Sequence, residues 1–177
     1  ATNIKKGEIA SFPITRPMEC LQIDHTGVLP LTENGNRYIV MIIDCFTKFV
    51  KLYPVKTVES EEVINCLLDW FATFGVARMI MSDNNLPFIP ELTEKMTNMF
   101  KVKRILTGPH CHREAGIIES INERIKLAFQ TSLTEATKWD TIIPMIEMSL
   151  TSTPNEATGT SPHEMLFGFD SRHQSSI

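Results

Sequence analysis

The sequence has no hydrophobic run long enough to cross a membrane, no paired cysteine motif and no excess of positive charge. Its longest unbroken apolar stretch runs only from Tyr38 to Ile43, whereas a membrane-spanning helix needs about 20 apolar residues. No signal-peptide pattern opens the chain. We therefore expect a soluble intracellular protein without a membrane partner.

Cysteines are few and scattered. The four thiols, which form no C-x-x-C pair and no closely spaced framework, belong to Cys20, Cys45, Cys66 and Cys111. Such spacing suits a reducing compartment better than a disulfide scaffold. We expect all four to be free.

The formal net charge of −4 argues against a chain that coats nucleic acid by bulk electrostatics. Charge is unevenly placed, however, because residues 94–126 contain seven Lys and Arg against four acids. This basic segment could meet DNA locally. A solvated charged surface is the alternative interpretation.

Length and hydrophobic periodicity predict one α/β domain with a mixed sheet. Residues 1–16 have no sustained period and read as an arm or linker that follows a preceding domain. Ser60 is the expected N-cap of the first helix, and Gly75 its end. Strands are predicted at 18–26, 38–44, 46–55, 78–82 and 102–106, and helices at 60–74, 90–100, 114–133, 138–149 and 161–167.

Three acidic residues stand at positions that suit a site. Asp24 and Asp83 lie near the ends of apolar, strand-like runs, and 35 residues separate Asp83 from Glu119, in the first turns of a predicted helix. At about 100° per residue, Asn122 and Lys126 return to roughly the same side of that helix as Glu119. A metal or a phosphate could use this face, although a plain solvent-facing surface is equally consistent with the pattern.

The order of these residues and their flanking motifs resembles the DDE catalytic core of retroviral and retrotransposon integrases, most closely the Ty3/gypsy class. The resemblance covers roughly residues 17–170 and is strong only as an ordered set. Its motifs are Asp24-His25-Thr26-Gly27, Gly35 to Val40, Asp44 with Phe46-Thr47-Lys48, Phe74-Gly75-Val76, Ser82-Asp83, Gly116 with Ile118-Glu119, Asn122, Thr158 to Pro162, and Met165 to Gly168.

This resemblance implies a ribonuclease-H-like fold with a mixed five-stranded sheet flanked by helices. Residues 17–170 would be the catalytic core and 171–177 a C-terminal tail. The implied enzyme is a polynucleotidyl transferase with endonuclease activity, which processes the 3′ ends of element DNA and joins them to target DNA. The resemblance also implies that the protein acts in the nucleus and that an assembly stage in the cytoplasm is possible.

The resemblance also assigns roles to residues. Asp24, Asp83 and Glu119 would be catalytic and would hold Mg²⁺ or Mn²⁺, because these hard cations prefer oxygen ligands. Two such ions about 3.5 to 4 Å apart stabilise the attacking and leaving oxygens of phosphoryl transfer. Asn122, Lys126 and Arg113 would contact DNA.

Other interpretations stay open at this stage. A host-adopted integrase domain could serve only as an interaction or dimerisation module, and a ribonuclease-H-type nuclease would use the same fold and metal chemistry. A zinc site at His110, Cys111 and His112 lacks a second ligand pair. Asp44 also ends an apolar strand, but we interpret it as a turn-capping carboxylate and leave it out of the triad.

Large apolar residues of two predicted helices suggest a symmetric homodimer or a higher oligomer. The alternative is that they simply fill the core. They are Trp70, Phe71, Phe74, Trp139, Ile142, Ile143 and Ile146.

Overall fold

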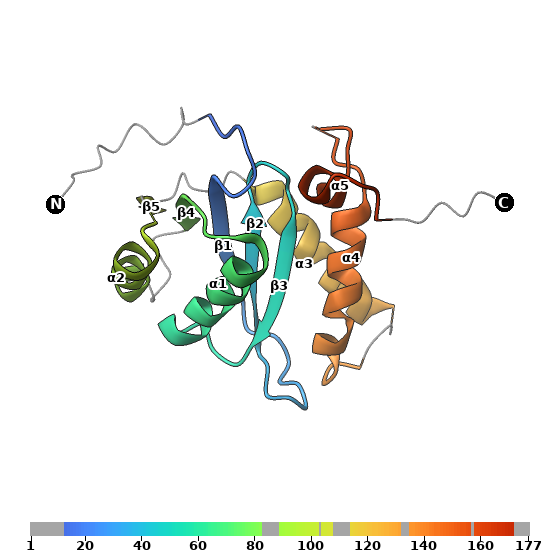
Figure 1. The fold of residues 1–177 in the computed structure, drawn as a ribbon. Coiled ribbons are helices and arrows are strands. Elements are labelled where there is room, and N and C mark those ends of the chain that lie inside the picture. Colours follow the sequence, from blue (N-terminus) through green and yellow to red (C-terminus); the bar gives the residue numbers. More distant parts are fainter. Residues whose placement is uncertain are drawn as a thin grey trace.

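The computed structural model describes residues 13–82, 89–102, 104–107, 114–131, 135–156 and 158–171. Within these ranges, no helix is long and apolar enough to cross a membrane. The strands are β1 (Cys20–Thr26), β2 (Tyr38–Asp44), β3 (Val50–Val55), β4 (Met79–Ser82) and β5 (Arg104–Thr107). The helices are α1 (Ser60–Phe74), α2 (Ile89–Phe100), α3 (Ala115–Gln130), the 3-10 helix η2 (Trp139–Ile142), α4 (Ile143–Ser152) and α5 (Pro162–Phe167) (Figure 1).

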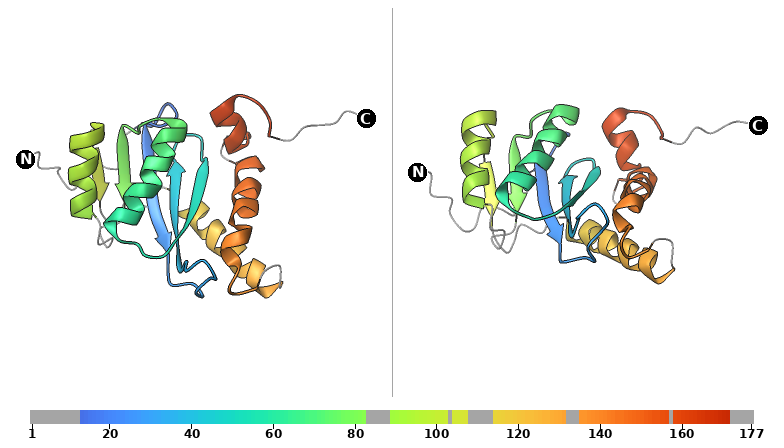
Figure 2. Two further views of the ribbon diagram at one scale, coloured as in Figure 1. Left: turned by 60° about the horizontal axis from the view of Figure 1, so that its bottom comes forward. Right: turned by 90° about the horizontal axis from the view of Figure 1, so that it is seen from below.

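The strands form one mixed sheet in the order β3-β2-β1-β4-β5. β1 pairs antiparallel with β2 and parallel with β4, so it lies at the junction of the two halves of the sheet. Helices α1 and α2 lie on one side of the sheet, and α3 and α4 lie on the other (Figure 2). The α/β class and the mixed sheet flanked by helices, both predicted from the sequence, are confirmed.

Alternation along β2 explains the two cores. Val40 and Ile42 pack with the buried face of α1, whereas Ile39, Met41 and Ile43 pack with α3 and α4. Successive side chains of a strand point to opposite faces. A continuous apolar strand is therefore what a sheet covered on both sides requires.

The third strand begins at Val50 and not at Phe46 as predicted. Residues 44–49 form a turn, which the Asp44 carboxylate closes by accepting from the backbone N–H and the hydroxyl of Thr47. Ser60 is also not the N-cap of α1, because Glu59 occupies that position without a side-chain bond. The carboxylate of Glu62 instead accepts the backbone N–H of Lys56.

Other predicted boundaries are confirmed or shift by a few residues. Gly75 ends α1 with φ of 98° and donates its N–H to the carbonyl of Phe71, and Ser161 caps α5. The predicted strand from 102 begins only at Arg104. The N–H of Val102 instead donates to the carbonyl of Met96 in α2.

The predicted dimer surface is wrong for most of its residues. Five of the seven are buried in the two cores between helices and sheet, namely Trp70, Phe71, Trp139, Ile143 and Ile146. Their apolar stripes face the sheet and not solvent, so periodicity alone could not distinguish core from interface. Dimerisation itself stays a prediction.

Candidate active site

Asp24 lies near the end of β1, on the side of the sheet that α3 covers. It pairs directly opposite Met41 of β2, which packs in the same core cluster as Ile121 of α3. Directly opposed residues of antiparallel strands present their side chains on one face. The Asp24 carboxylate is half-buried, and its Oδ1 accepts the backbone N–H of His25 over 2.7 Å.

The second predicted acid, Asp83, directly follows β4, the strand that pairs with β1. Ile23 and Ser82 are paired residues of the parallel β1 and β4 strands. They directly precede Asp24 and Asp83 in the chain. Asp83 itself lies outside the described residues.

Glu119 is exposed on α3, a helix whose start is bonded to β1. The backbone N–H of Glu114, just before the first residue of α3, donates to Oε1 of Gln22 over 2.9 Å. Gln22 is two residues before Asp24 and therefore shares its face of β1. The helix of Glu119 and the strand of Asp24 thus meet on one side of the sheet.

The predicted DNA contacts differ in their surroundings. Lys126 is exposed on α3, whereas Asn122 is half-buried, and its Oδ1 has no hydrogen-bond partner in the described part of the chain. Ile121 and Ile125 occupy the buried side of the same helix. Arg113 lies outside the described residues. The three DNA contacts stay predictions.

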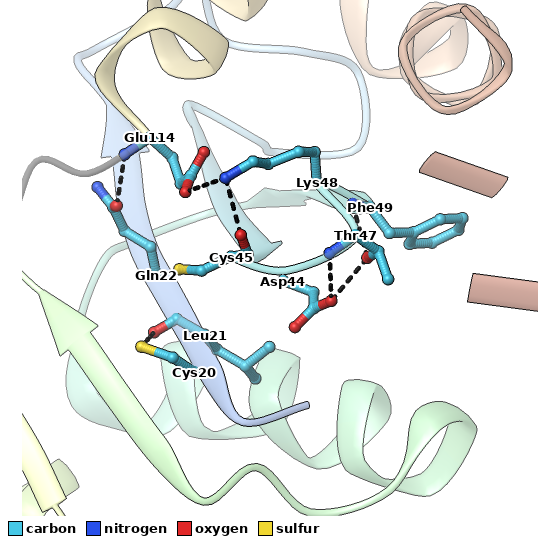
Figure 3. A network of polar contacts seen from close by, with 9 residues as sticks. All are labelled: Cys20, Leu21, Gln22, Asp44, Cys45, Thr47, Lys48, Phe49 and Glu114. Atoms are coloured by element: carbon cyan, nitrogen blue, oxygen red, sulfur yellow. Dashed lines mark hydrogen bonds and ion pairs between the residues drawn. The ribbon is translucent and has the colours of Figure 1, made fainter. Parts of the chain in front are cut away.

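A second acid, Glu114, was missed by sequence reasoning. It is buried, and its carboxylate lies 2.7 Å from Nζ of Lys48 in the turn between β2 and β3 (Figure 3). Lys48 also donates to the carbonyl oxygen of Cys45 over 2.7 Å. An acid at a helix start is a familiar signal, but no local pattern points to a partner 66 residues away.

Asp44 serves the fold, as predicted. It is fully buried, and its Oδ1 accepts the backbone N–H of Met18 over 3.0 Å. Its Oδ2 accepts the N–H and hydroxyl of Thr47 at 2.9 and 2.6 Å. Both oxygens are thus engaged in closing a turn, which leaves Asp44 out of the candidate site.

The described cysteines are buried free thiols, as predicted. A hydrogen bond with Cys20, together with burial, holds the pKa of Cys45 well above its usual range. Burial raises the pKa of Cys66 to about 12. Cys45 and Cys66 therefore stay protonated and are poor nucleophiles or metal ligands. Cys111, with the zinc alternative at His110 and His112, lies outside the described residues.

His25 faces away from Asp24 and is packed against the opposite side of the sheet. Its ring stacks on Tyr38, with centroids 6.4 Å apart. Burial lowers the pKa of His25, although the Asp24 charge opposes this shift. The unfolded chain therefore binds the proton more readily than the folded protein. Stability linked to neutral His25 is present above the ordinary pKa of about 6.5 and is lost as pH falls through the lowered value.

We predict that His25→Phe loses less stability than the parent when the pH falls from neutral to acidic. Phenylalanine keeps the ring stacking and cannot be protonated. Thermal melts at pH 7.5 and pH 5 would measure it. The difference in melting temperature between variant and parent should favour the variant more at pH 5 than at pH 7.5. Protonation of the carboxylates affects both proteins equally and therefore cancels in this difference. An equal difference at both pH values would contradict this prediction.

The geometry therefore defines a ribonuclease-H-like α/β domain whose central strand and third helix carry acids on one side of the sheet. Among the described residues, no group of three or more His, Cys, Asp or Glu is placed to hold a metal ion, and that set does not contain Asp83. The family profile of the integrase core domain matches residues 14–111, more than half of the chain. The chain belongs to the integrase core domain family.

Relatives of the chain are viral and transposon polyproteins. The Pro-Pol polyprotein of Simian foamy virus type 3 (strain LK3) is 26% identical over 170 residues, which are 92% of this chain and 15% of the polyprotein. The Gag-Pol polyprotein of Koala retrovirus is 28% identical over 159 residues, covering 86% and 9% of the two. The retrovirus-related Pol polyprotein from transposon 412 of Drosophila melanogaster is 24% identical over 151 residues, covering 82% and 12%. The chain thus spans a small part of each.

Two solved structures share the fold. One chain of the cryo-EM structure of the simian T-cell lymphotropic virus intasome in complex with PP2A regulatory subunit B56 gamma has a TM-score of 0.68 at 18% identity, covering 88% of this chain and 57% of that one. The HTLV-2 integrase catalytic core domain in complex with magnesium, in a trimeric form, has a TM-score of 0.63 at 20% identity, covering 85% and 97%.

Proposed function

We propose that this chain is the catalytic core of an integrase that cuts element DNA near its 3′ ends with water and then joins the new 3′ hydroxyl to target DNA. Asp24, Asp83 and Glu119 are its catalytic carboxylates. The observation that carries the proposal is the bond from the start of α3 to Gln22 of β1, two residues before Asp24. Through this bond, the helix of Glu119 packs against the face of β1 that carries Asp24.

The donor chemistry fits Mg²⁺ or Mn²⁺. Asp24 and Glu119 offer half-exposed and exposed carboxylate oxygens, and Asp83 adds a third carboxylate by sequence. His25 stacks on the other face of β1, so no imidazole competes for the ion from that position. Hard oxygen donors favour these two cations over soft metals. When bound, such ions neutralise charge on the reacting phosphate.

The residues around the acids would hold and orient DNA. Lys126 presents a positive charge to solvent from the helix of Glu119, where a phosphate could be neutralised. Asn122 would contact DNA only after its side chain turns outward, because its Oδ1 is enclosed by protein and has no hydrogen-bond partner within the described residues. Arg113 would add a further phosphate contact. The backbone N–H of His25, which donates to Oδ1 of Asp24, limits rotation of that carboxylate.

The partners are part of the same proposal. The solved relatives are described as an intasome and as a trimeric form, which supports action as a homodimer or higher oligomer on element-end DNA and target DNA. Both retroviral and transposon polyproteins are similar to the chain. We propose a Ty3/gypsy-type element as its source and the nucleus as its site of action.

The experiment that tests this function combines joining with metal-dependent stability. The chain, purified with its neighbouring domains, should join a short duplex to target DNA in Mg²⁺ or Mn²⁺. Binding of the ion to the folded state should raise the melting temperature, and saturation at 100 times Kd corresponds to about 2.7 kcal/mol. Glu119→Gln should lose most of that gain. No joining, together with no metal-dependent shift up to about 10 mM, would reject the proposal.

A second candidate function is an interaction module with relaxed chemistry, in a domain that its host has adopted. It is favoured by the apolar side chains that α4 presents to solvent, since Met145 and Met148 are each 68% exposed and Leu127 of α3 is exposed nearby. Large exposed apolar surface commonly marks an interaction site. The two functions separate in the metal experiment, because only the enzyme requires a stabilising ion.

A further inference from the structure

The start of α3 is held by contacts that reach two different parts of the sheet (Figure 3). The Glu114 carboxylate, on a side chain only 4% exposed, lies 2.7 Å from Nζ of Lys48. The Glu114 N–H donates to Oε1 of Gln22 over 2.9 Å. Its carbonyl oxygen accepts the N–H of Ile118, so Glu114 occupies the N-cap position of α3. One residue therefore begins the helix and binds the sheet.

Both partners of Glu114 are themselves fixed. Gln22 is 2% exposed in the middle of β1, which is paired on both sides. Lys48 has a left-handed backbone with φ of 65°, and its N–H donates to the carbonyl of Asp44, which closes the turn between β2 and β3. This conformation is uncommon outside glycine, asparagine and aspartate. Its Nζ is also bonded to the carbonyl of Cys45. The contacts thus connect α3 to ordered backbone.

The residues that make these contacts are close in sequence to Asp24 and Glu119 of the proposed site. Gln22 precedes Asp24 by two residues on the same face of β1. Glu119 follows Glu114 by five residues, which is about 7.5 Å along a helix axis. A tilt or shift of the first turn of α3 against β1 would therefore move Glu119 relative to Asp24.

The burial of the ion pair favours orientation over stability as its role. An apolar pair of similar volume would often stabilise a core as well or better, whereas a buried carboxylate without its partner is strongly unfavourable. Glu114 consequently has one low-energy arrangement, in contact with Lys48. A charged pair in this place limits the positions available to the start of the helix.

We propose that Lys48, Glu114 and Gln22, here named the α3 clamp, position Glu119 against Asp24 for the reaction. The inference rests on the proposed function of the site. Glu114 and Lys48 are positioning residues in it and do not contact DNA or metal. The clamp acts before any ion binds, so its effect is measurable in the metal-free protein.

The chain supplies a matched control. Lys51 of β3 and Glu147 of α4 form a second ion pair of 3.4 Å, and Glu147 also accepts the N–H of Leu52 over 2.9 Å. The same residue types thus connect a different helix to the edge strand of the sheet. Helix α4 carries none of the proposed catalytic residues.

The test compares Glu114→Gln, Lys48→Met and their double variant with Glu147→Gln, in the chain with its neighbouring domains. Amide hydrogen exchange of residues 114–122 without metal should speed up about tenfold in both single clamp variants, because local opening becomes easier. The maximal joining rate should fall at least about tenfold, since small misplacements are costly to catalysis. KM for DNA should change less than about twofold.

The double variant should be no worse than the worse single variant, because both act through one contact. Glu147→Gln should leave both the exchange of residues 114–122 and the joining rate near those of the parent. Gln22→Leu removes the other half of the clamp while leaving the ion pair in place. It should reproduce the faster exchange even if a charge variant fails to fold.

Several outcomes overturn the clamp. Unchanged exchange at 114–122 in both Glu114→Gln and Gln22→Leu would do so, and so would an equal loss of joining in Glu147→Gln. If the parent protein itself neither joins DNA nor responds to Mg²⁺ or Mn²⁺, the proposed function fails. The exchange comparison still decides in that case whether the clamp orders the start of α3.

Discussion

Asp24→Asn should reduce joining of element DNA at least about a thousandfold, which corresponds to about 4 kcal/mol of transition-state stabilisation. The substitution removes one negative charge from the acids that hold the ions. It keeps a side-chain oxygen that can accept the His25 N–H, as Asp24 does at 2.7 Å. The fold should therefore persist, with a melting temperature within about 2 °C of the parent.

Single-turnover joining assays and thermal melts on the same preparations would measure this effect. Asp83→Asn and Glu119→Gln should behave alike, because the carboxylates act as a unit. Glu123→Gln is the control, since it removes the same charge from an exposed position one turn further along α3. Joining by Asp24→Asn above about a tenth of the parental rate would contradict a metal-holding role.

Asp44→Ala should cause a large loss of stability, whereas Asp24→Asn should lose joining and keep its stability. Asp44 is fully buried and accepts three hydrogen bonds, from the backbone N–H groups of Met18 and Thr47 and from the Thr47 hydroxyl. Each orphaned buried donor costs about 1 to 3 kcal/mol. We expect a total of about 3 to 5 kcal/mol, or a drop in melting temperature of roughly 10 °C.

Denaturant unfolding of Asp44→Ala beside Asp24→Ala would compare two aspartates that look alike in the sequence. Asp24→Ala truncates a half-buried side chain and should cost less than Asp44→Ala, about 1 kcal/mol. If both variants lost the same stability, the division between a structural and a catalytic aspartate would not hold. The comparison needs no assay of activity.

Local signals explain why so much of the fold was predictable. Helix α1 is found where its apolar spacing and Gly75 predicted it, and β2 is found at the predicted continuous apolar run. Two boundary predictions failed because side-chain hydrogen bonds to nearby backbone, which apolar spacing does not reveal, shape these segments. β3 starts after the turn that Asp44 closes, and before α1 the carboxylate of Glu62 accepts the backbone N–H of Lys56.

The candidate site was predictable only in part for the same reason. Motifs predicted Asp24 and Glu119, and the structure packs the helix of Glu119 against the face of β1 that carries Asp24. Lys48 and Glu114 were missed because an ion pair across 66 residues leaves no periodic trace. The burial of Trp70 was equally invisible, since a stripe of aromatics has the same spacing in a core and at an interface.

The pairing of Ile23 with Ser82 also limits how this chain can diverge. An insertion or deletion inside β1 or β4 would turn the following side chains to the other face, because a strand repeats every two residues. Additions in the connections between Thr26 and Met79 would leave the pairing untouched, and longer loops cost little. The distance in sequence between the two aspartates is therefore free to drift, while the position of Asp24 on its strand is not.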